Sequence, residues 1–440
     1  MQLAGWGRFP VHEAHVTAPR SEAEIVSCIQ QGRAIARGNG RAYGDSAISV
    51  TNTIHMRQFN RMLGFDDKTG TLITEAGVLL ADIIAVFLER GWFPAVTPGT
   101  KFVTLGGMIA ADVHGKNHHR DGGLGNFVDW IDIMDGDGKL QRCSREHNAD
   151  LFAWTIGGMG LTGVILRAAI RLRRVETAWI SQTIVPAATL DATLDAFESN
   201  ADATYSVAWI DCLNPGNKLG RSLVYLGEHA ALAHLGSSQK SRPFETSTRR
   251  RLTVPFEAPH WLLNRLFMRW FNDFHFWQGS HGPTQKLVDW DSYFYPLDSI
   301  PGWNKVYGRK GFAQFQCVLP LAQSRTGLQA LLDAISSAGV GSFLAVVKRL
   351  GDQPGRFSFP MAGYTLAIDF PVNATCLRLM ETLDRITITH GGRFYLAKDS
   401  RMSSETLAES DERIERFIAM RDKAGLQRQF QSAQSKRLAL

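Results

Sequence analysis

The sequence predicts an α+β protein of two domains. Its 440 residues are more than one hydrophobic core usually contains, and 44% hydrophobic with 20% charged residues is typical of a folded globular chain. Glycine-rich loops separate short β-type runs in the first part of the chain. From about Glu176 to Arg393, strands alternate with helices. This alternation predicts a second domain in which helices back a sheet.

The cysteines and the charge narrow the possible function classes. Because the five cysteines are scattered and never paired as CxxC, we expect a reducing compartment, no disulfide framework and no metal site. No apolar run is long enough to span a membrane, and the N-terminus has no secretory apolar core. The net charge of +6 is compatible with nucleic acid, anionic lipid or a phosphorylated substrate. The cysteines are Cys28, Cys143, Cys212, Cys317 and Cys376.

The first elements lead into a glycine-rich loop. Ser21 to Glu24 form a capping-box pattern, which predicts the start of a helix that ends near Gly32. A buried strand over Ala34–Ala36 runs into the loop 38–46, GNGRAYGDS. Three glycines in seven positions can turn successive N–H groups inward as an anion nest, which suits a pyrophosphate. An ordinary glycine-rich turn is the alternative, since the loop lacks the GxGxxG and P-loop patterns.

The first domain is organised around a second glycine-rich stretch, Pro94 to His119. It follows a helix predicted over 77–91, and it combines four glycines with three histidines at its end. Positions without side chains let a backbone approach a ligand closely, and the polar cluster 112–119 follows at once. Solvated histidines on a glycine-rich loop are the alternative. A strand over Val128–Met134 that enters a hairpin, and a strand from Val164 onward, complete the domain.

The second domain is expected to contain helices over 190–197, 327–338 and 377–389, and strands around Gln316 and Lys348. The last segment, Ser404 to Gly425, is predicted to be one charged amphipathic helix.

One segment of the second domain has an unusual pattern. Arg249–Arg251 precede 261–277, where Arg265, Arg269 and Asn272 fall on one helical face. An aromatic, arginine-flanked helix is typical of an interfacial membrane segment. A core helix with a solvated basic face explains the pattern equally well, and nucleic acid is the weakest interpretation. The apolar face consists of Leu263, Leu266, Phe267, Trp270, Phe274 and Trp277.

Four segments together resemble the vanillyl-alcohol-oxidase, or PCMH-type, family of FAD enzymes, and within it the decaprenylphosphoryl-β-D-ribose 2-oxidases. They are GRAYGDS at 40–46, VTPGTKFVTLGGMIAADVHGKNHH at 96–119, GGMGLTGVILRA at 157–168 and YLAKDSR at 395–401. The likeness continues through the second domain, in FAQFQCVLP at 312–320 and GYTLAIDFP at 363–371. It covers nearly the whole chain, and the pair HGKNHH and AKDSR is specific.

The resemblance implies an FAD-binding domain of residues 1–175, to which 393–440 return, and an inserted substrate-binding domain of residues 176–392 with an antiparallel sheet backed by helices. The residues that match the family's pyrophosphate loops are Gly38, Asn39, Gly40, Arg41, Ala42, Tyr43, Gly44, Asp45, Ser46, Thr104, Leu105, Gly106 and Gly107. Other cofactor contacts would be Gly99, Ala111, Asp112, Val113, His114, Val164 and Tyr395. Asp45 stands where many relatives carry a histidine bonded to the flavin, which implies non-covalent FAD, with His114 as the alternative tether.

The resemblance also implies a reaction. It is the oxidation of the 2′-hydroxyl of a polyprenylphosphoryl-β-D-ribose to a ketone, the first half of an epimerisation that yields the arabinose donor for cell-envelope polysaccharide. Lys398 would accept the hydroxyl proton, or would only hold the hydroxyl by a hydrogen bond. Lys348 would contact the phosphate. The rest of the catalytic pocket would consist of His114, Tyr43, Gln316 and Lys116.

Partners and alternatives follow from the same resemblance. An NAD(P)H-dependent keto-reductase would complete the epimerisation, and oxygen or a quinone would take the electrons. The lipid-linked substrate and the aromatic segment favour peripheral attachment to the cytoplasmic or periplasmic face of the inner membrane, with no nucleic acid involved. One alternative is an FAD oxidase of a soluble sugar, alditol or aldonolactone. Another is a non-catalytic protein that binds polyprenyl phosphate or glycan.

Two positions depart from the family. Ala367 stands where the mycobacterial relatives carry a cysteine that nitroaromatic inhibitors attack, and Thr365 stands where the family has asparagine. We therefore expect no covalent attack by such inhibitors and a difference in fine specificity.

Overall fold

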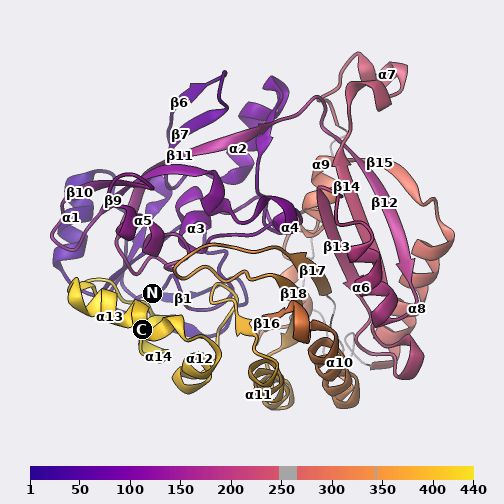
Figure 1. Ribbon diagram of the computed structural model, residues 1–440. Helices are drawn as coiled ribbons and strands as arrows, with labels where there is room; N and C mark the ends of the chain where they lie inside the picture. The colour runs from indigo at the N-terminus through magenta and orange to yellow at the C-terminus, as the bar shows by residue number, and fades with distance from the viewer. Residues whose placement is uncertain (247–264, 341, 343) are drawn as a thin grey trace.

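The computed structural model describes residues 1–246, 265–340, 342 and 344–440, and the arginine cluster 249–251 lies outside them. Two large sheets stand side by side in the fold, one of six strands and one of eight (Figure 1). Smaller sheets of two and three strands accompany them. None of the helices in the described ranges combines the length and the apolar character that crossing a membrane requires.

A small parallel sheet delivers the chain into the first glycine-rich loop. Its order is β3 (Val16–Thr17), β5 (Asn52–His55), β4 (Ala34–Arg37). Helix α1 (Glu22–Gln30) packs beside it and begins where predicted, because the Ser21 side chain accepts a hydrogen bond from the backbone N–H of Glu24. The predicted strand after Gly32 is confirmed as β4, and the loop 38–46 starts at its end. A separate hairpin-like pair consists of β1 (Gln2–Ala4) and β2 (Val11–Glu13).

The six-stranded sheet is built from residues 62–174 and has the order β10-β9-β11-β7-β6, with β8 paired to β11. The predicted strand and hairpin around Val128–Met134 are confirmed. Ile83, Ile109 and Phe152 from three helices share one apolar core with the sheet. The elements are β6 (Met62–Asp66), β7 (Thr71–Glu75), α2 (Leu80–Phe87), β8 (Trp92–Pro94), α3 (Leu105–Ala110), α4 (His118–Asp121), β9 (Val128–Met134), β10 (Leu140–Ser144), α5 (Ala149–Thr155) and β11 (Val164–Arg174).

The eight-stranded sheet confirms the predicted antiparallel sheet backed by helices. Its order is β15-β12-β14-β13-β17-β18-β16-β19, and every neighbouring pair is antiparallel. The strands are β12 (Trp179–Ala187), β13 (Tyr205–Ile210), β14 (Ser222–His229), β15 (Gln285–Asp289), β16 (Phe312–Pro320), β17 (Ala345–Leu350), β18 (Gly363–Pro371) and β19 (Arg393–Phe394). The helices are α6 (Leu190–Glu198), α7 (Ser237–Lys240), α8 (Arg265–His281), α9 (Trp290–Phe294), α10 (Leu321–Ala338) and α11 (Ala374–Thr389).

The two faces of this sheet have different neighbours, because successive side chains of a strand point to opposite faces. Cys317, Val347 and Leu366 belong to the apolar core that the sheet forms with α6, α10 and α11. The positions next to them, such as Gln316 and Lys348, point to the other face. That face borders a cavity shared with the first part of the chain.

The C-terminal segment differs from the prediction of one helix over Ser404–Gly425. It contains α12 (Ser404–Ser410) and α13 (Arg413–Lys423), and α14 (Ala433–Arg437) follows. The break occurs at Asp411, whose backbone is extended and whose carboxylate accepts hydrogen bonds from the backbone N–H and side chain of Arg413. A side chain that captures a backbone donor in this way competes with helix continuation.

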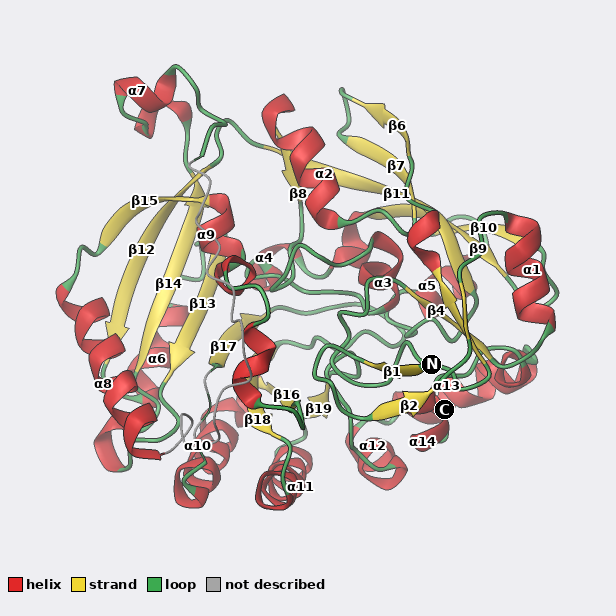
Figure 2. Ribbon diagram, turned by 180° about the vertical axis from the view of Figure 1, so that it is seen from behind, coloured by secondary structure: helices red, strands yellow, loops and turns green. Residues whose placement is uncertain are grey.

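Helix α8 packs against β12 and β14 of the eight-stranded sheet, at the end of that sheet away from the six-stranded one (Figures 1 and 2). Its predicted part before Arg265 lies outside the described residues. The interpretation as a core helix with a solvated basic face is wrong, because Asn272 is 5% exposed whereas Trp270 is 62% exposed. The polar side packs inward and the aromatic side faces solvent.

Candidate active site

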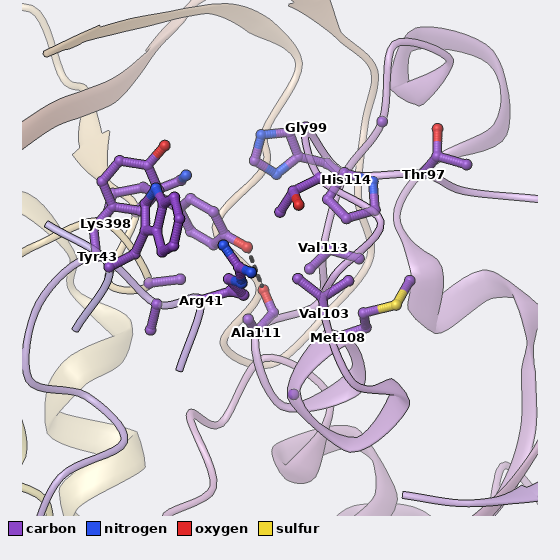
Figure 3. Close-up of a pocket in the computed structure, with 18 of the residues that line it drawn as sticks. Arg41, Tyr43, Thr97, Gly99, Val103, Met108, Ala111, Val113, His114 and Lys398 are labelled. Carbon is purple, nitrogen blue, oxygen red and sulfur yellow. Dashed lines mark hydrogen bonds between the residues drawn. The ribbon is translucent and has the colours of Figure 1, made fainter. Parts of the chain in front are cut away.

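A cavity of about 600 Å³ lies between the two large sheets, a volume typical of a ligand or cofactor pocket. One end is lined by the loop 38–46 and the segment 97–116, and the other by side chains of the eight-stranded sheet. Figure 3 shows Lys398 against the ring of Tyr43, with His114 farther along the wall. The cavity thus joins residues that are far apart in the chain.

Glycines keep the first end of the cavity open. A Cβ on Gly38 would lie 2.0 Å from Thr104 Oγ1, and one on Gly106 would lie 2.8 Å from the Cβ of Ala76. These backbones approach their neighbours more closely than any side chain allows. A Cβ on Gly99 would meet nothing within 4 Å, so this backbone borders open space. The wall here is largely main chain and suits a ligand held by backbone groups.

Lysines occupy the other end of the cavity. Lys348 on β17 lines it, and within the described residues no hydrogen bond or ion pair satisfies its ammonium. Burial lowers the pKa of Lys348 to about 8. Its charge also lowers the pKa values of three of the groups around it, His114, Lys116 and Lys398. Lys348 is therefore a cation in the cavity wall without a counter-ion from the described part of the protein.

Lys116 is held differently. Its Nζ donates hydrogen bonds to the backbone carbonyls of Tyr293 and Phe294 and lies 4.5 Å from the centroid of the Tyr293 ring. Burial, followed by the charge of Lys348, lowers the pKa of Lys116 to about 7. At neutral pH the Lys116 amine is therefore protonated in only a fraction of the molecules.

Lys398 lies in the short turn after β19. Its Nζ is 3.5 Å from the centroid of the Tyr43 ring, a cation–π contact when the amine is protonated. Burial lowers the pKa of Lys398, the carboxylate of Asp369 raises it and the charge of Lys348 lowers it again. Asp369 is itself buried, accepts a hydrogen bond of 2.5 Å from Gln314 Nε2, and has a pKa raised by burial. An amine with a lowered pKa is a competent proton acceptor near neutral pH.

His114 is neutral and oriented by its neighbours. Gln316 Nε2 lies 3.2 Å from His114 Nε2 and 3.3 Å from Thr365 Oγ1. Since the amide nitrogen donates, His114 Nε2 accepts and the ring proton is assigned to Nδ1. Burial, then the charge of Lys348, lowers the pKa of His114 well below its ordinary value. The ring of Tyr395 packs against it with centroids 5.0 Å apart, and Tyr395 donates a 3.1 Å hydrogen bond to the Ala111 carbonyl.

Comparison with known proteins places the chain in a family. Residues 14–144 match the FAD binding domain family. The chain is 35% identical over 454 residues to decaprenylphosphoryl-beta-D-ribose oxidase of Mycolicibacterium smegmatis, an alignment that covers 100% of this chain and 97% of that protein. The chain belongs to this family of FAD-binding oxidases. Cytokinin dehydrogenase 2 of Arabidopsis thaliana is 29% identical over 36% of the chain and 33% of its own length. L-gulonolactone oxidase of Mus musculus is 31% identical over 37% of the chain and 36% of its own length.

The cavity fits the family's cofactor, FAD. Two buried donors in its wall, Arg41 Nε and His114 Nδ1, have no hydrogen-bond partner within the described residues. The Arg41 guanidinium stacks over Trp6 with 4.0 Å to the ring centroid, beside the main-chain wall of the loop 38–46. A fixed cation next to backbone amides suits a pyrophosphate, and an unpaired ring N–H suits a polar edge of the flavin. These residues would hold FAD between the glycine-rich end and the lysines.

Most of the residues expected to contact the cofactor line the cavity, and five lie behind its wall. Asp45 is ion-paired with Arg437, with 2.8 Å between Oδ1 and Nη2, and Asp112 accepts a hydrogen bond from the backbone N–H of Gly125. Such contacts fix the loops on which the lining residues lie. The five are Gly44, Asp45, Leu105, Asp112 and Val164. All six expected catalytic residues line the cavity, namely Tyr43, His114, Lys116, Gln316, Lys348 and Lys398.

Several residues of the cavity and its surroundings were not predicted from the sequence. Gln314 lines the wall and binds Asp369, while Trp209 and Tyr225 line the end toward α8. Two of these residues could have been predicted from the alternation of side chains along a strand. Gln314 lies two residues before Gln316, and Asp369 lies two residues after Ala367, so each pair shares a face.

Proposed function

We propose that this protein oxidises the 2′-hydroxyl of a polyprenylphosphoryl-β-D-ribose to the 2′-ketone. The observation that carries the proposal is Lys348, a cation in the cavity interior without a counter-ion among the described residues. Leaving a charge unpaired inside a protein is costly, so the arrangement is best explained by an anionic substrate. The relative from Mycolicibacterium smegmatis is named for a phosphorylated ribose that bears a polyprenyl chain.

The cavity offers a different environment to each part of such a substrate. Lys348 and, in part, Lys116 would hold the phosphate as point charges. Lys398 would contact the sugar, because it lines the same cavity as Lys348 and Lys116 and packs against Tyr43. The apolar chain would leave along Val346, Trp209 and Tyr225, which line the end of the cavity toward α8.

Oxidation of a secondary alcohol removes a hydride from carbon and a proton from the hydroxyl. FAD supplies the hydride acceptor. The protein's part is to orient the alcohol and to take its proton. Neutral Lys398 accepts that proton, and its lowered pKa keeps the unprotonated form accessible near neutral pH. Asp369 beside it stabilises the ammonium that results.

We further propose that FAD is bound without a covalent link. Asp45 stands at the position where many relatives attach the flavin, and it is a buried carboxylate paired with Arg437. The neutral His114 is already hydrogen-bonded through Nε2 to Gln316. Acid precipitation of the protein should therefore release all of the flavin into the supernatant.

The test is anaerobic reduction of the purified flavoprotein. A ribosyl polyprenyl phosphate should bleach the visible flavin absorption and yield the 2′-keto product. Replacement of Lys398 with alanine should leave the yellow colour and slow the bleaching by about 100-fold or more, the contribution typical of a general base. Unaltered bleaching by this variant would contradict the role of Lys398.

The alternatives give distinct results in the same assay. A soluble-sugar oxidase would be bleached by a free alditol or aldonolactone and not by the phosphorylated lipid. A non-catalytic binder would bind the lipid and keep its colour. The unpaired Lys348 favours the phosphorylated substrate over a soluble sugar. The lowered pKa of Lys398, which suits a proton acceptor, favours an enzyme over a non-catalytic binder.

The proposal places the protein in a reaction sequence and at a surface. The 2′-ketone has to be reduced from the opposite side to give arabinose, which calls for a separate NAD(P)H-dependent reductase. The reduced flavin has to pass its electrons to oxygen or to a quinone. A substrate with a polyprenyl chain resides in a membrane, so we place the protein at the periphery of the inner membrane.

A further inference from the structure

Helix α8 carries an exposed row of aromatic side chains. Phe267, Trp270, Phe274 and Trp277, here called the aromatic face, are 41%, 62%, 47% and 57% exposed. Within the described part of the chain, no other aromatic side chain is as exposed. Their spacing places all four within an arc of about 80° and along about 15 Å of helix. Trp270 and Phe274 stack on each other, with centroids 5.9 Å apart.

The opposite side of α8 is polar and anchors the helix to the sheet. Asn272 donates a 2.8 Å hydrogen bond to the buried carboxylate of Asp211, and Arg269 donates to the Leu213 carbonyl. A helix normally turns its apolar side to the core, whereas this one buries Met268 together with Asn272 and leaves most of its aromatic side chains exposed. The aromatic face is thus held outward by specific polar contacts.

The charges beside the aromatic face are balanced, and no acidic side chain among the described residues there would repel an anionic surface. Asp273 is the only acidic residue of α8, and its carboxylate is neutralised by Arg221 at 2.5 Å. Lys218 lies 3.9 Å from the same carboxylate and is 64% exposed. An aromatic row with no unpaired acid beside it is what an interfacial helix presents to lipid.

The same helix packs behind part of the cavity wall. His275 packs its ring against Trp209, with centroids 4.7 Å apart, and its Nε2 lies 3.4 Å from the hydroxyl of Tyr225. Trp209 and Tyr225 both line the apolar end of the cavity. The exposed aromatic face and the apolar end of the cavity are therefore connected through His275 and the two side chains that it contacts.

We infer that the aromatic face docks the protein on the surface of a lipid bilayer, next to the point where the polyprenyl chain enters the cavity. The inference rests on the proposed function for the identity of the polyprenyl chain. The exposed position of the aromatic face does not depend on that function. Tryptophan and phenylalanine bury their rings at the headgroup boundary, where tryptophan N–H groups stay hydrated. A bilayer fits better than a protein groove, because the row is aromatic along its whole length and has no polar group at its centre.

The experiment measures binding to vesicles in the absence of substrate. The purified flavoprotein is sedimented with vesicles of equal parts phosphatidylethanolamine and phosphatidylglycerol. The test variant combines Trp270→Ser, Phe274→Ser and Trp277→Ser. The matched control combines Leu63→Ser, Val86→Ser and Leu140→Ser, three exposed apolar residues outside α8. Flavin absorbance of each variant reports that it is folded.

We expect the test variant to lose vesicle binding at least about tenfold and the control to bind within about twofold of the unaltered protein. Flavin reduction by a water-soluble, short-chain substrate should be unchanged in the test variant, which separates docking from the proposed chemistry. Equal vesicle binding by both variants, or none by the unaltered protein, would overturn the inference. So would a change in oligomeric state, measured by light scattering, without a change in vesicle binding, because a second copy would then cover the face.

Discussion

Replacement of Lys348 tests the electrostatic basis of substrate binding. In Lys348→Met, an apolar side chain of similar length removes the ammonium from the cavity. A hydrogen bond to a charged group contributes about 1.5–3 kcal/mol, so the dissociation constant of a ribosyl polyprenyl phosphate should rise by about 10- to 150-fold. Lys310→Met, which alters an exposed lysine outside the cavity, is the matched control.

The pH dependence sharpens the same prediction. Burial lowers the pKa of Lys348 to about 8, so the cation is present below that pH and is lost above it. For a pKa near 8, the protonated fraction falls about tenfold between pH 7 and pH 9. The phosphodiester of the substrate keeps its single charge throughout this range. Affinity should therefore weaken about tenfold as the pH rises from 7 to 9.

The assay is a titration of the bound flavin's visible spectrum with a short-chain substrate, from pH 6.5 to 9.5. Lys348→Arg should keep the affinity and lose the decline above pH 8, because arginine stays protonated over this range. Any decline that remains near pH 7 belongs to Lys116, whose pKa is about 7. An analogue without the phosphate should bind Lys348→Met and the unaltered protein equally. Affinity that is independent of pH, or unchanged in Lys348→Met, would refute a phosphate site at this residue.

Two more predictions concern the sugar end of the cavity. Ala367 lines the wall and no cysteine does within the described residues, so nitroaromatic inhibitors should leave the protein's mass unchanged. Ala367→Cys should form a stable adduct in the mass spectrum, and an adduct on the unaltered protein would contradict the prediction. Asp369→Asn removes the carboxylate that raises the pKa of Lys398, so the acid limb of flavin reduction should move to lower pH by about one unit. A limb that stays in place would show that Lys398 is not the titrating base.

The sequence contained enough information for the local parts of the fold. The cap at Ser21, the strands around Gln316 and Lys348 and the hairpin after Met134 all follow from patterns within a few residues, and the structure confirms them. The glycine-rich loops were also visible as loops. Their partners were not, because the contact of Gly38 with Thr104 joins segments that only the folded chain brings together.

The orientation of α8 and the role of Asp369 could not be predicted from local sequence patterns. Helical spacing separates the two sides of α8, but the choice of the inward side depends on the bond between Asn272 and Asp211, which lie 61 positions apart. Asp369 could be placed on the face shared with Ala367. Its effect on Lys398 depends on how β18 meets the turn after β19, and no local pattern predicts that meeting. The structure supplied both through tertiary contacts.

The lone charge of Lys348 leads to one more prediction, on stability. Folding lowers the pKa of this lysine from 10.5 to about 8, so the folded state binds its proton more weakly than the unfolded state. At pH 7 the difference corresponds to about 3 kcal/mol of destabilisation, and it is lost as the pH rises from 8 to 10.5. Lys348→Met should therefore raise the melting temperature of the substrate-free flavoprotein at pH 7, although it binds substrate more weakly. Opposite effects on stability and affinity are expected where a protein keeps a strained residue for function. A melting temperature that falls would mean that Lys348 has a structural partner, and the phosphate would then need another site.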